Sequence, residues 1–501
     1  MALIEITPKQ AGIYTNGTEY SASGRWVDGN FIRFQNGALT SIGGWEKAKQ
    51  TALLGTPIAM YSYNTNDGKP VIAIATRQKI YINFDNQWVD ITPVGYVNDM
   101  DSGLLGWGAY NYNVETYNTA RSQSGLNFNT KSVFFDNWGE YLIFCASQDG
   151  KIYQWQPSSP TSAATQITNS PTGNTAIIVS NERHLVALGS NSNPRRVAFS
   201  NREDYNTWTP AATNTAGSFE IPSAGIILGA KRFNSEIVIF TDVGVNRMSF
   251  VGSPFIYGSQ VAGENCPTIS IRSVVSTGNF LCWLGENSIY MYDGQVREVP
   301  CDVSDFIHDN LNRTYAKTAC GGHNSKFSEV WWFFPSGSST TPDKYILWDY
   351  SENTWSVGSL DRSCWMDSGT NEFPMAGKSD GSIYVHEKGQ LQSSDGVNHL
   401  TLPFARTAPI EINGGNTTAQ FNQIIPDEEA INLPALTLSF KGKNTPNGPE
   451  TDFGSFNFDA SDGYTDARFS GRQITMTVTG VTTEKWKVGK IRADIRAKGK
   501  R

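Results

Sequence analysis

Charged side chains are scarce in this chain of 501 residues, at 17% of the total where globular proteins carry roughly 25%. Long apolar runs are also missing, because segments such as Val71–Ala75 and Val330–Phe334 are far too short to span a bilayer. The opening residues show neither the basic nor the apolar region of a secretory signal. We therefore expect a protein that is made in a cytoplasm and is not exported by a cleavable signal.

Motifs for catalysis and metal binding are missing as well. The sequence has no HExxH and no P-loop, its five histidines are scattered, and no cysteine and histidine are arranged as a nucleophile and its base. Without CxxC spacings we expect no zinc site and six reduced, unpaired thiols. These cysteines are Cys145, Cys266, Cys282, Cys301, Cys320 and Cys364. We predict that the protein is not an enzyme and needs no cofactor or metal.

Weaker acidic signals each have a simpler explanation. Three aspartates around Ser461–Gly463 lack the full EF-hand spacing for calcium, and a solvated turn explains them better. Two pairs of acids could serve a glycosidase, although such pairs are common by chance. Ser147–Trp155 loosely resembles the Asp-box of sialidases, but its adjacent Asp and Gly favour a hairpin turn. The acidic candidates are Asp459, Asp462 and Asp466; Glu203 with Asp204; and Asp361 with Asp367.

Aromatic residues and glycine are plentiful, with 12% Phe, Trp and Tyr and 47 glycines. This composition favours an all-β protein. One pattern recurs between about residues 55 and 395: an apolar strand, a tight polar turn, and a strand that usually carries Ile-Tyr. Such repeated hairpins are typical of a β-propeller, here of about six blades, and a pair of sandwiches is the alternative. The second strands begin near Lys79, Lys151, Ser288, Ser382, Lys344 and, more distantly, Val245.

Other elements mark the organisation of the chain. A short helix is expected over Val303–Leu311, with Ser304 as its N-cap. After Leu402 the pattern changes to half-buried strands, which indicate a β-sandwich-like domain. We predict an N-terminal segment over 1–45 that joins this additional platform domain, a propeller over 46–402, and a C-terminal β domain over 403–501.

The C-terminal segment from Lys485 carries eight cations and one acid, Asp494. Its net charge is +7, which leaves −14 on residues 1–484 of a chain whose total is −7. A solvated final strand is the simpler explanation of this charge run. The alternative is a surface that binds nucleic acid or an acidic partner. The residues that we assign to partner binding are Lys485, Lys487, Lys490 and Arg492.

Several segments resemble the tail nozzle proteins of short-tailed bacteriophages, also called tail tubular protein B or packaged-DNA stabilisation proteins. They are Arg25–Gly37 followed by Gly43-Gly44-Trp45, Gly229–Phe240, Leu284–Val299 with the helix after it, Val330–Trp355, and Trp486–Arg492. The resemblance lies in the pattern and order of these segments along most of the chain.

This resemblance implies a structural protein of the virion. Members of the family form a six-fold ring below the portal and its adaptor, surround the channel through which the double-stranded genome leaves, and carry fibres, spikes or a needle. No catalytic residue and no small-molecule substrate is implied. A receptor-binding or glycan-processing tail propeller and a lectin-like scaffold propeller remain the alternatives.

Overall fold

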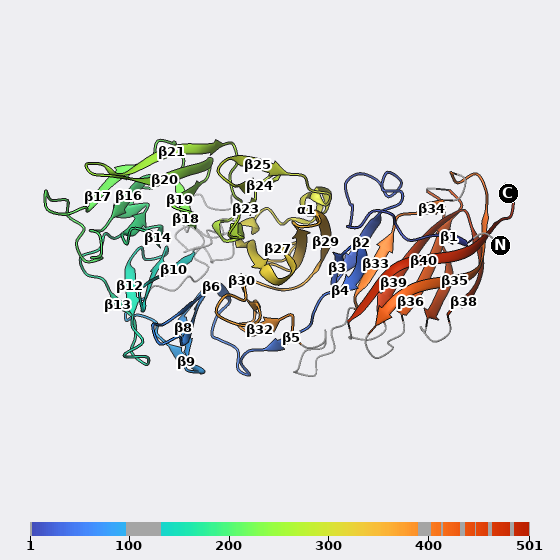
Figure 1. Cartoon of the computed structure of the whole chain (residues 1–501), viewed down its shortest axis with the longest axis horizontal. Helices are drawn as coiled ribbons and strands as arrows, with labels where there is room; N and C mark the ends of the chain where they lie inside the picture. Colours follow the sequence, from blue (N-terminus) through green and yellow to red (C-terminus); the bar gives the residue numbers. More distant parts are fainter. Residues whose placement is uncertain are drawn as a thin grey trace, which may run out of the picture.

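The computed structural model describes residues 3–96, 132–388, 402–411, 414–430, 436–445, 447–458, 463–480 and 485–499. Nearly all regular structure is β, and it forms two units along the long axis of the molecule (Figure 1). One unit is a ring of four-stranded antiparallel sheets, and the other is a pair of six-stranded sheets that contains both chain ends. The predicted all-β class and β-propeller are thereby confirmed.

Seven four-stranded sheets form the propeller blades in the described part of the chain, one more than the predicted number of about six. In each, the four strands follow one another in antiparallel order, and only the seventh borrows a strand from elsewhere. Blades one to four are β6 (Pro57–Asn64), β7 (Pro70–Thr76), β8 (Ile80–Phe84) and β9 (Gln87–Asp90); β10 (Val133–Trp138), β11 (Tyr141–Ala146), β12 (Ile152–Trp155) and β13 (Thr165–Gln166); β14 (Ala176–Val179), β15 (Leu185–Leu188), β16 (Arg196–Phe199) and β17 (Gly217–Glu220); and β18 (Ile227–Phe233), β19 (Glu236–Thr241), β20 (Gly244–Gly252) and β21 (Ile256–Glu264).

The remaining three blades complete the ring. They are β22 (Val275–Ser276), β23 (Leu281–Leu284), β24 (Ile289–Tyr292) and β25 (Val296–Val299); β26 (Cys320–Asn324), β27 (Glu329–Phe334), β28 (Lys344–Asp349) and β29 (Thr354–Ser359); and β30 (Cys364–Met366), β31 (Met375–Gly377), β32 (Ile383–His386) and β5 (Trp45–Lys47). The 3-10 helices η1 (Ser190–Ser192), η2 (Ile271–Ser273), η3 (Ala316–Thr318) and η4 (Ser325–Phe327) lie in connections.

The strands that carried the repeated sequence pattern are the third strands of six blades. In these strands an apolar residue enters the core on each side of the blade, as with Ile152 and Tyr153, which are both buried. The third blade was missed because its third strand reads Arg196-Val197-Ala198-Phe199, with no Ile-Tyr pair. Its core is nevertheless apolar, since Val197 and Phe199 are buried between neighbouring blades.

The seventh blade closes the ring with a strand from the other end of the propeller sequence. Its outer strand β5 pairs with β32, where Trp45 lies opposite His386 and Lys47 opposite Tyr384. The indole of Trp45 is 1% exposed and packs on the His386 ring at a centroid distance of 5.5 Å. Closure therefore joins residues that are more than three hundred positions apart.

The second unit, which we call the two-sheet unit, consists of two six-stranded sheets. One contains β1 (Leu3–Glu5), β3 (Ile32–Gln35), β4 (Ala38–Ser41), β40 (Trp486–Ala497), β35 (Ala419–Ala430) and β38 (Thr465–Gly471). The other contains β2 (Trp26–Asn30), β33 (Phe404–Thr407), β34 (Ile410–Glu411), β39 (Gln473–Gly480), β36 (Leu436–Lys443) and β37 (Thr451–Phe458).

The two sheets pack face to face through aromatic rings. Phe469 of the first sheet stacks on Phe421 of the same sheet at 4.6 Å and meets Phe440 of the second sheet at 4.9 Å between ring centroids. Both Phe421 and Phe440 are fully buried. Strands from the beginning and the end of the chain thus share one core.

The helix α1 (Ser304–Asn310) lies between the fifth and sixth blades, close to its predicted range. Its capping was predicted incorrectly, because Ser304 is the first helical residue and makes no side-chain cap bond. The side-chain oxygen of Asn16 takes that role from outside the helix: it accepts a hydrogen bond from the Asp305 amide at 3.2 Å and from the Ser304 hydroxyl at 2.9 Å. The N-terminal segment is thereby fastened to the propeller. Among the described residues, no helix is long and apolar enough to cross a membrane.

Candidate functional site

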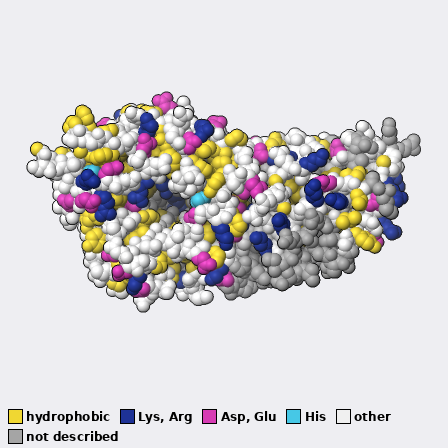
Figure 2. Space-filling model, in the orientation of Figure 1, with side chains coloured by type: hydrophobic (Ala, Val, Ile, Leu, Met, Phe, Trp, Pro, Cys, Tyr) yellow, Lys and Arg dark blue, Asp and Glu magenta, His cyan; other side chains and the backbone are white. Residues whose placement is uncertain are grey.

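The basic residues assigned to partner binding lie on β40 or directly before it. Lys485, Lys490 and Arg492 are exposed, and Lys487 is half-buried. β40 is an interior strand of its sheet, paired with β35 on one side and with β4 and β1 on the other. The four cations therefore follow one strand, and dark-blue side chains are visible at this end of the molecule (Figure 2).

An irregularity in β40 decides which residues face outward. Opposite β35, residues Gly489 and Lys490 occupy a stretch where the partner strand has one residue fewer, and the register shifts there. Such a bulge adds one residue and reverses the in–out order of the side chains that follow it. Val488 and Ile491, three positions apart, are therefore both buried in the core. Strict alternation from the sequence would have placed one of them outside.

Between these four cations and the side chains that the structure describes, ion pairing is weak. The Nζ of Lys490 lies 3.9 Å from a carboxylate oxygen of Glu5 on β1, and both side chains are well exposed. Asp494, the one acid of the segment, is 3% exposed and accepts a hydrogen bond from Asn422 at 3.1 Å, so it lies within the sheet. The acids whose side chains the structure describes here therefore offset only part of the positive charge of these cations.

A buried ion cluster joins the two-sheet unit to the propeller. Arg33 on β3 is 2% exposed, and its guanidinium contacts the carboxylate of Glu329 on β27 at 2.7 Å. It also pairs with Glu387, which follows β32. Asn324 donates to both carboxylates, and the Trp331 indole donates to Glu329 at 3.1 Å. One buried guanidinium thus forms ion pairs with two carboxylates.

The charge balance of this cluster shifts its proton affinities. Burial raises the pKa of Glu329 to about 7; Arg33 opposes this shift and Glu387 adds to it. The two carboxylates raise the already high pKa of Arg33 further, against the effect of burial. The three side chains Arg33, Glu329 and Glu387 together are neutral when Glu329 holds a proton, and they carry one negative charge when it does not.

The described acidic candidates for a glycosidase pair or a calcium site are engaged in local structure. Glu203 pairs with Arg183 at 3.2 Å. Hydrogen bonds from Thr207 and the backbone, chiefly the Thr207 hydroxyl, lower the pKa of Asp204. Asp361 accepts from Ser379, and Asp367 pairs with His323 at 2.9 Å. Asp466 accepts from Gln423 at 3.2 Å, while Asp459 and Asp462 lie outside the described residues.

Two short motifs form hairpin turns. The carboxylate of Asp149 accepts hydrogen bonds from the Lys151 amide at 3.0 Å and the Tyr153 hydroxyl at 2.6 Å, and Gly150 has a φ of 64°. The Asp-Gly turn predicted here is therefore confirmed. The stretch Gly377–Gly381 matches Gly-x-Ser-x-Gly, which sequence reasoning missed, but it joins two strands and not a strand to a helix.

The six cysteines are free thiols, and all but Cys301 are buried. Burial raises the pKa of Cys320 and Cys301 to about 12, and of Cys266 and Cys364 to about 11. No group of three or more potential metal ligands occurs in the part of the chain that the structure describes.

Comparisons with known proteins assign no family to this chain. No family model matches the sequence, and no curated protein matches it. Similar solved structures include the Neurospora crassa Pan2 WD40 domain, with a TM-score of 0.40 at 11% identity over 70% of this chain and 97% of that one. The β-propeller domain of Myceliophteria thermophila Cps50 (Swd1) gives 0.40 at 10% identity over 68% and 99%. Virginiamycin B lyase of Staphylococcus aureus gives 0.39 at 10% identity over 67% and 97%.

Proposed function

We propose that this chain is a structural subunit of the tail nozzle of a short-tailed bacteriophage. Six copies form a ring below the adaptor, the genome leaves through its channel, and fibres, spikes or a needle attach to it. In this proposal the protein belongs to the virion and is made in the bacterial cytoplasm. It needs no catalytic residue or cofactor.

One observation carries the proposal. Two of the segments that resemble nozzle proteins, Arg25–Gly37 and Trp486–Arg492, come from opposite ends of the sequence but contribute strands to one sheet, in the order β3-β4-β40. The same N-terminal segment supplies Arg33, whose buried ion cluster fixes this sheet to the sixth and seventh blades. The N-terminal one of these two resembling segments therefore also joins the two units.

The charge of the chain suits a conduit for DNA. Six copies of a chain with a net charge of −7 carry −42, and a wall that repels phosphate lets a duplex pass without adhering. Low charge content also suits extensive subunit contacts, because the centres of protein interfaces are depleted in charge.

The basic strand β40 then has a role outside the channel. If its cations faced the lumen they would hold the DNA, since each phosphate contact adds a salt-sensitive attraction. We place Lys485, Lys487, Lys490 and Arg492 against an acidic surface of the adaptor or of a neighbouring subunit. Complementary charges there speed and orient docking more than they tighten it.

Mass measurement tests the oligomer directly. Light scattering behind size-exclusion chromatography, on the full chain at several concentrations and with adaptor protein added, should find a species near 331 kDa, six times 55.1 kDa. Electron microscopy of virions labelled with antibody should place the protein at the tail tip. A monomer that binds glycans, with no label on virions, would instead support the lectin-like scaffold. Sugar release by the purified protein would support the glycan-processing alternative.

A further inference from the structure

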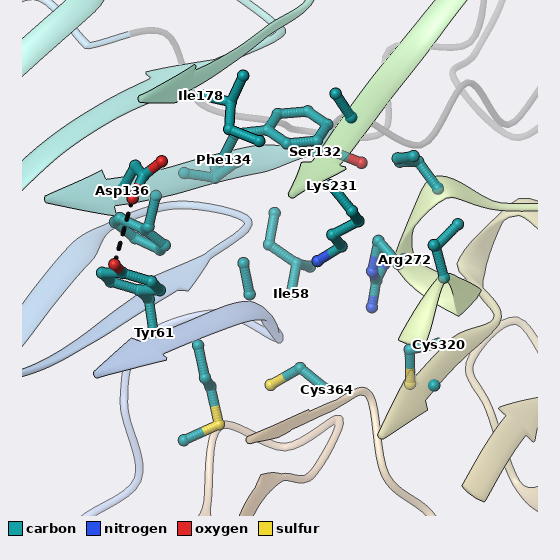
Figure 3. Close-up of a pocket in the computed structure, with 18 of the residues that line it drawn as sticks. Ile58, Tyr61, Ser132, Phe134, Asp136, Ile178, Lys231, Arg272, Cys320 and Cys364 are labelled. Atoms are coloured by element: carbon teal, nitrogen blue, oxygen red, sulfur yellow. Dashed lines mark hydrogen bonds between the residues drawn. The ribbon is translucent and has the colours of Figure 1, made fainter. Parts of the chain in front are cut away.

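Most large apolar side chains of the propeller are buried within and between its blades. Those of Ile58, Phe134 and Ile178, on the first strands of their blades, line an inner cavity of about 250 Å³ (Figure 3). In the same cavity the Tyr61 hydroxyl donates a hydrogen bond to the carboxylate of Asp136 at 3.3 Å. The hairpin of β20 and β21 in the fourth blade differs, because it carries apolar side chains outward.

This hairpin is longer than the outer hairpins of the other blades. Both of its strands have nine residues, whereas the third and fourth strands of the other six blades have between two and six. In Figure 1 β20 and β21 lie side by side at the edge of the propeller. We call residues 250–256, where the chain turns from β20 into β21, the hairpin tip.

Exposure rises along the hairpin towards this tip. Met248 and Tyr257, on either side of the turn, are at most 6% exposed, whereas three apolar residues between them are 43%, 57% and 78% exposed. No charged residue occurs in positions 248–263. The tip therefore presents apolar side chains to solvent and has no charge of its own. The three exposed residues are, in the same order, Phe250, Val251 and Phe255.

The base of the hairpin is fixed to the third blade. The Tyr257 hydroxyl donates a hydrogen bond to the Ser180 hydroxyl at 2.8 Å and lies 2.9 Å from Nδ1 of His184, which is fully buried. The Tyr257 ring also packs on Phe250, with 5.7 Å between the ring centroids. The tip is thereby held in place before it meets a partner, which lowers the entropy cost of binding.

We propose that the hairpin tip inserts into the surface of a phospholipid membrane. Its exposed apolar side chains present roughly 300 Å², well below the ~800 Å² that each partner of a stable protein–protein contact buries. A membrane sets no such minimum, because apolar side chains gain free energy wherever they leave water for the acyl region. This inference goes beyond the proposed tail function and does not depend on it.

The absence of charge at the tip determines how this binding should respond to conditions. A basic surface such as that of β40 binds anionic lipid and is weakened by salt, because screening reduces its attraction to the headgroups. The hairpin tip should instead bind uncharged phosphatidylcholine, with an affinity that salt does not lower. We expect a partition constant comparable with that of one myristoyl chain, on the order of 10⁴ M⁻¹.

Flotation of the full chain with phosphatidylcholine vesicles measures this constant. Phe255→Ser should lower it about tenfold or more, because the variant loses the burial of one aromatic ring. Val243→Ser is the matched control, since Val243 is 46% exposed but lies directly before β20, at the far end of the strand from the tip. It should float as the wild type does. A wild-type protein that does not float, or equal flotation of Phe255→Ser and wild type, overturns the proposal.

A fluorescent label reports on the tip itself. The native cysteines are free thiols, and all but Cys301 are buried, so a cysteine introduced at the surface can be labelled selectively. An environment-sensitive dye on Phe255→Cys should brighten and shift to shorter wavelength when vesicles are added, and the same dye on Val243→Cys should not. Unchanged emission from the dye at position 255 contradicts insertion.

Light scattering tests a protein partner for the same tip. An oligomer of the wild-type chain that dissociates in Phe255→Ser, together with no flotation of either protein, would assign the tip to a contact between copies and overturn the membrane proposal. An equal mass for the two proteins, together with weaker flotation of Phe255→Ser, supports it.

Discussion

Glu329→Gln should change the stability of the protein in a pH-dependent way that follows from the buried cluster with Arg33. Glu329 is 1% exposed, and its pKa in the folded protein is raised to about 7 from an ordinary value near 4.5. A raised carboxyl pKa means that the folded state binds the proton more tightly than the unfolded state. This tighter proton binding stabilises the folded state. Its contribution to the free energy of unfolding is complete below about pH 4.5 and is lost as the pH rises through 7.

The size of the effect follows from the shift. About 2.5 pKa units at 1.36 kcal/mol each give up to about 3 kcal/mol between the two limits. Glutamine mimics the protonated acid, so the variant should match wild type near pH 5 and exceed it by up to that amount at pH 8. The reason is that one guanidinium then faces one carboxylate, Glu387, instead of two.

Differential scanning fluorimetry from pH 5 to 8 in constant ionic strength measures this difference. The melting temperature of Glu329→Gln minus that of wild type should grow with pH to a few degrees. Glu298→Gln, on the exposed surface of β25, should show a flat difference. A Glu329→Gln protein that is less stable than wild type at pH 8 would refute the reasoning, because it would mean that the ionised acid is fully compensated by Arg33.

Three other outcomes are expected. Replacing Lys485, Lys487, Lys490 and Arg492 together with glutamine should slow assembly with ring or adaptor, most at low salt, with an unchanged circular dichroism spectrum; assembly rates equal to wild type at every ionic strength would favour the solvated strand. Asn16→Ala should lose the cap of α1, about 1 kcal/mol, and speed hydrogen exchange of the Asp305 amide roughly fivefold, whereas unchanged exchange would contradict the capping role. The six thiols should react with a thiol reagent at pH 7 only after denaturation, and rapid reaction of the native protein would contradict their raised pKa values.

Much of the propeller could be predicted because its signal is local. An apolar strand, a tight turn and an Ile-Tyr strand fit within about fifteen residues, as in Tyr141–Trp155, and each blade centre needs such a hairpin. The third blade was missed because burial of its third strand requires only apolar side chains. Val197 and Phe199 on one face and Ala198 on the other meet that need without an Ile-Tyr pair.

The partners of the chain ends could not be predicted in the same way. The strand β5 is only three residues long, and nothing in Trp45–Lys47 specifies pairing with β32. The burial of Arg33 likewise depends on Glu329 and Glu387, which are about three hundred residues away. The bulge at Gly489 and Lys490 forms opposite the neighbouring strand β35, so alternation within β40 alone does not specify which of its residues face the core.

Closure of the propeller by β5 has a consequence for biosynthesis. The strand is made early, but its partner β32 follows about 340 residues later, which at 5–20 residues per second is roughly 20–70 s of translation. The sheet of β1, β4 and β40 waits longer still, since β40 ends at Ala497. A chain that ends before β32 cannot complete the propeller, and one that ends before β40 cannot complete the two-sheet unit, so a prematurely terminated copy exposes unpaired strand edges to proteolysis before it can enter an assembly.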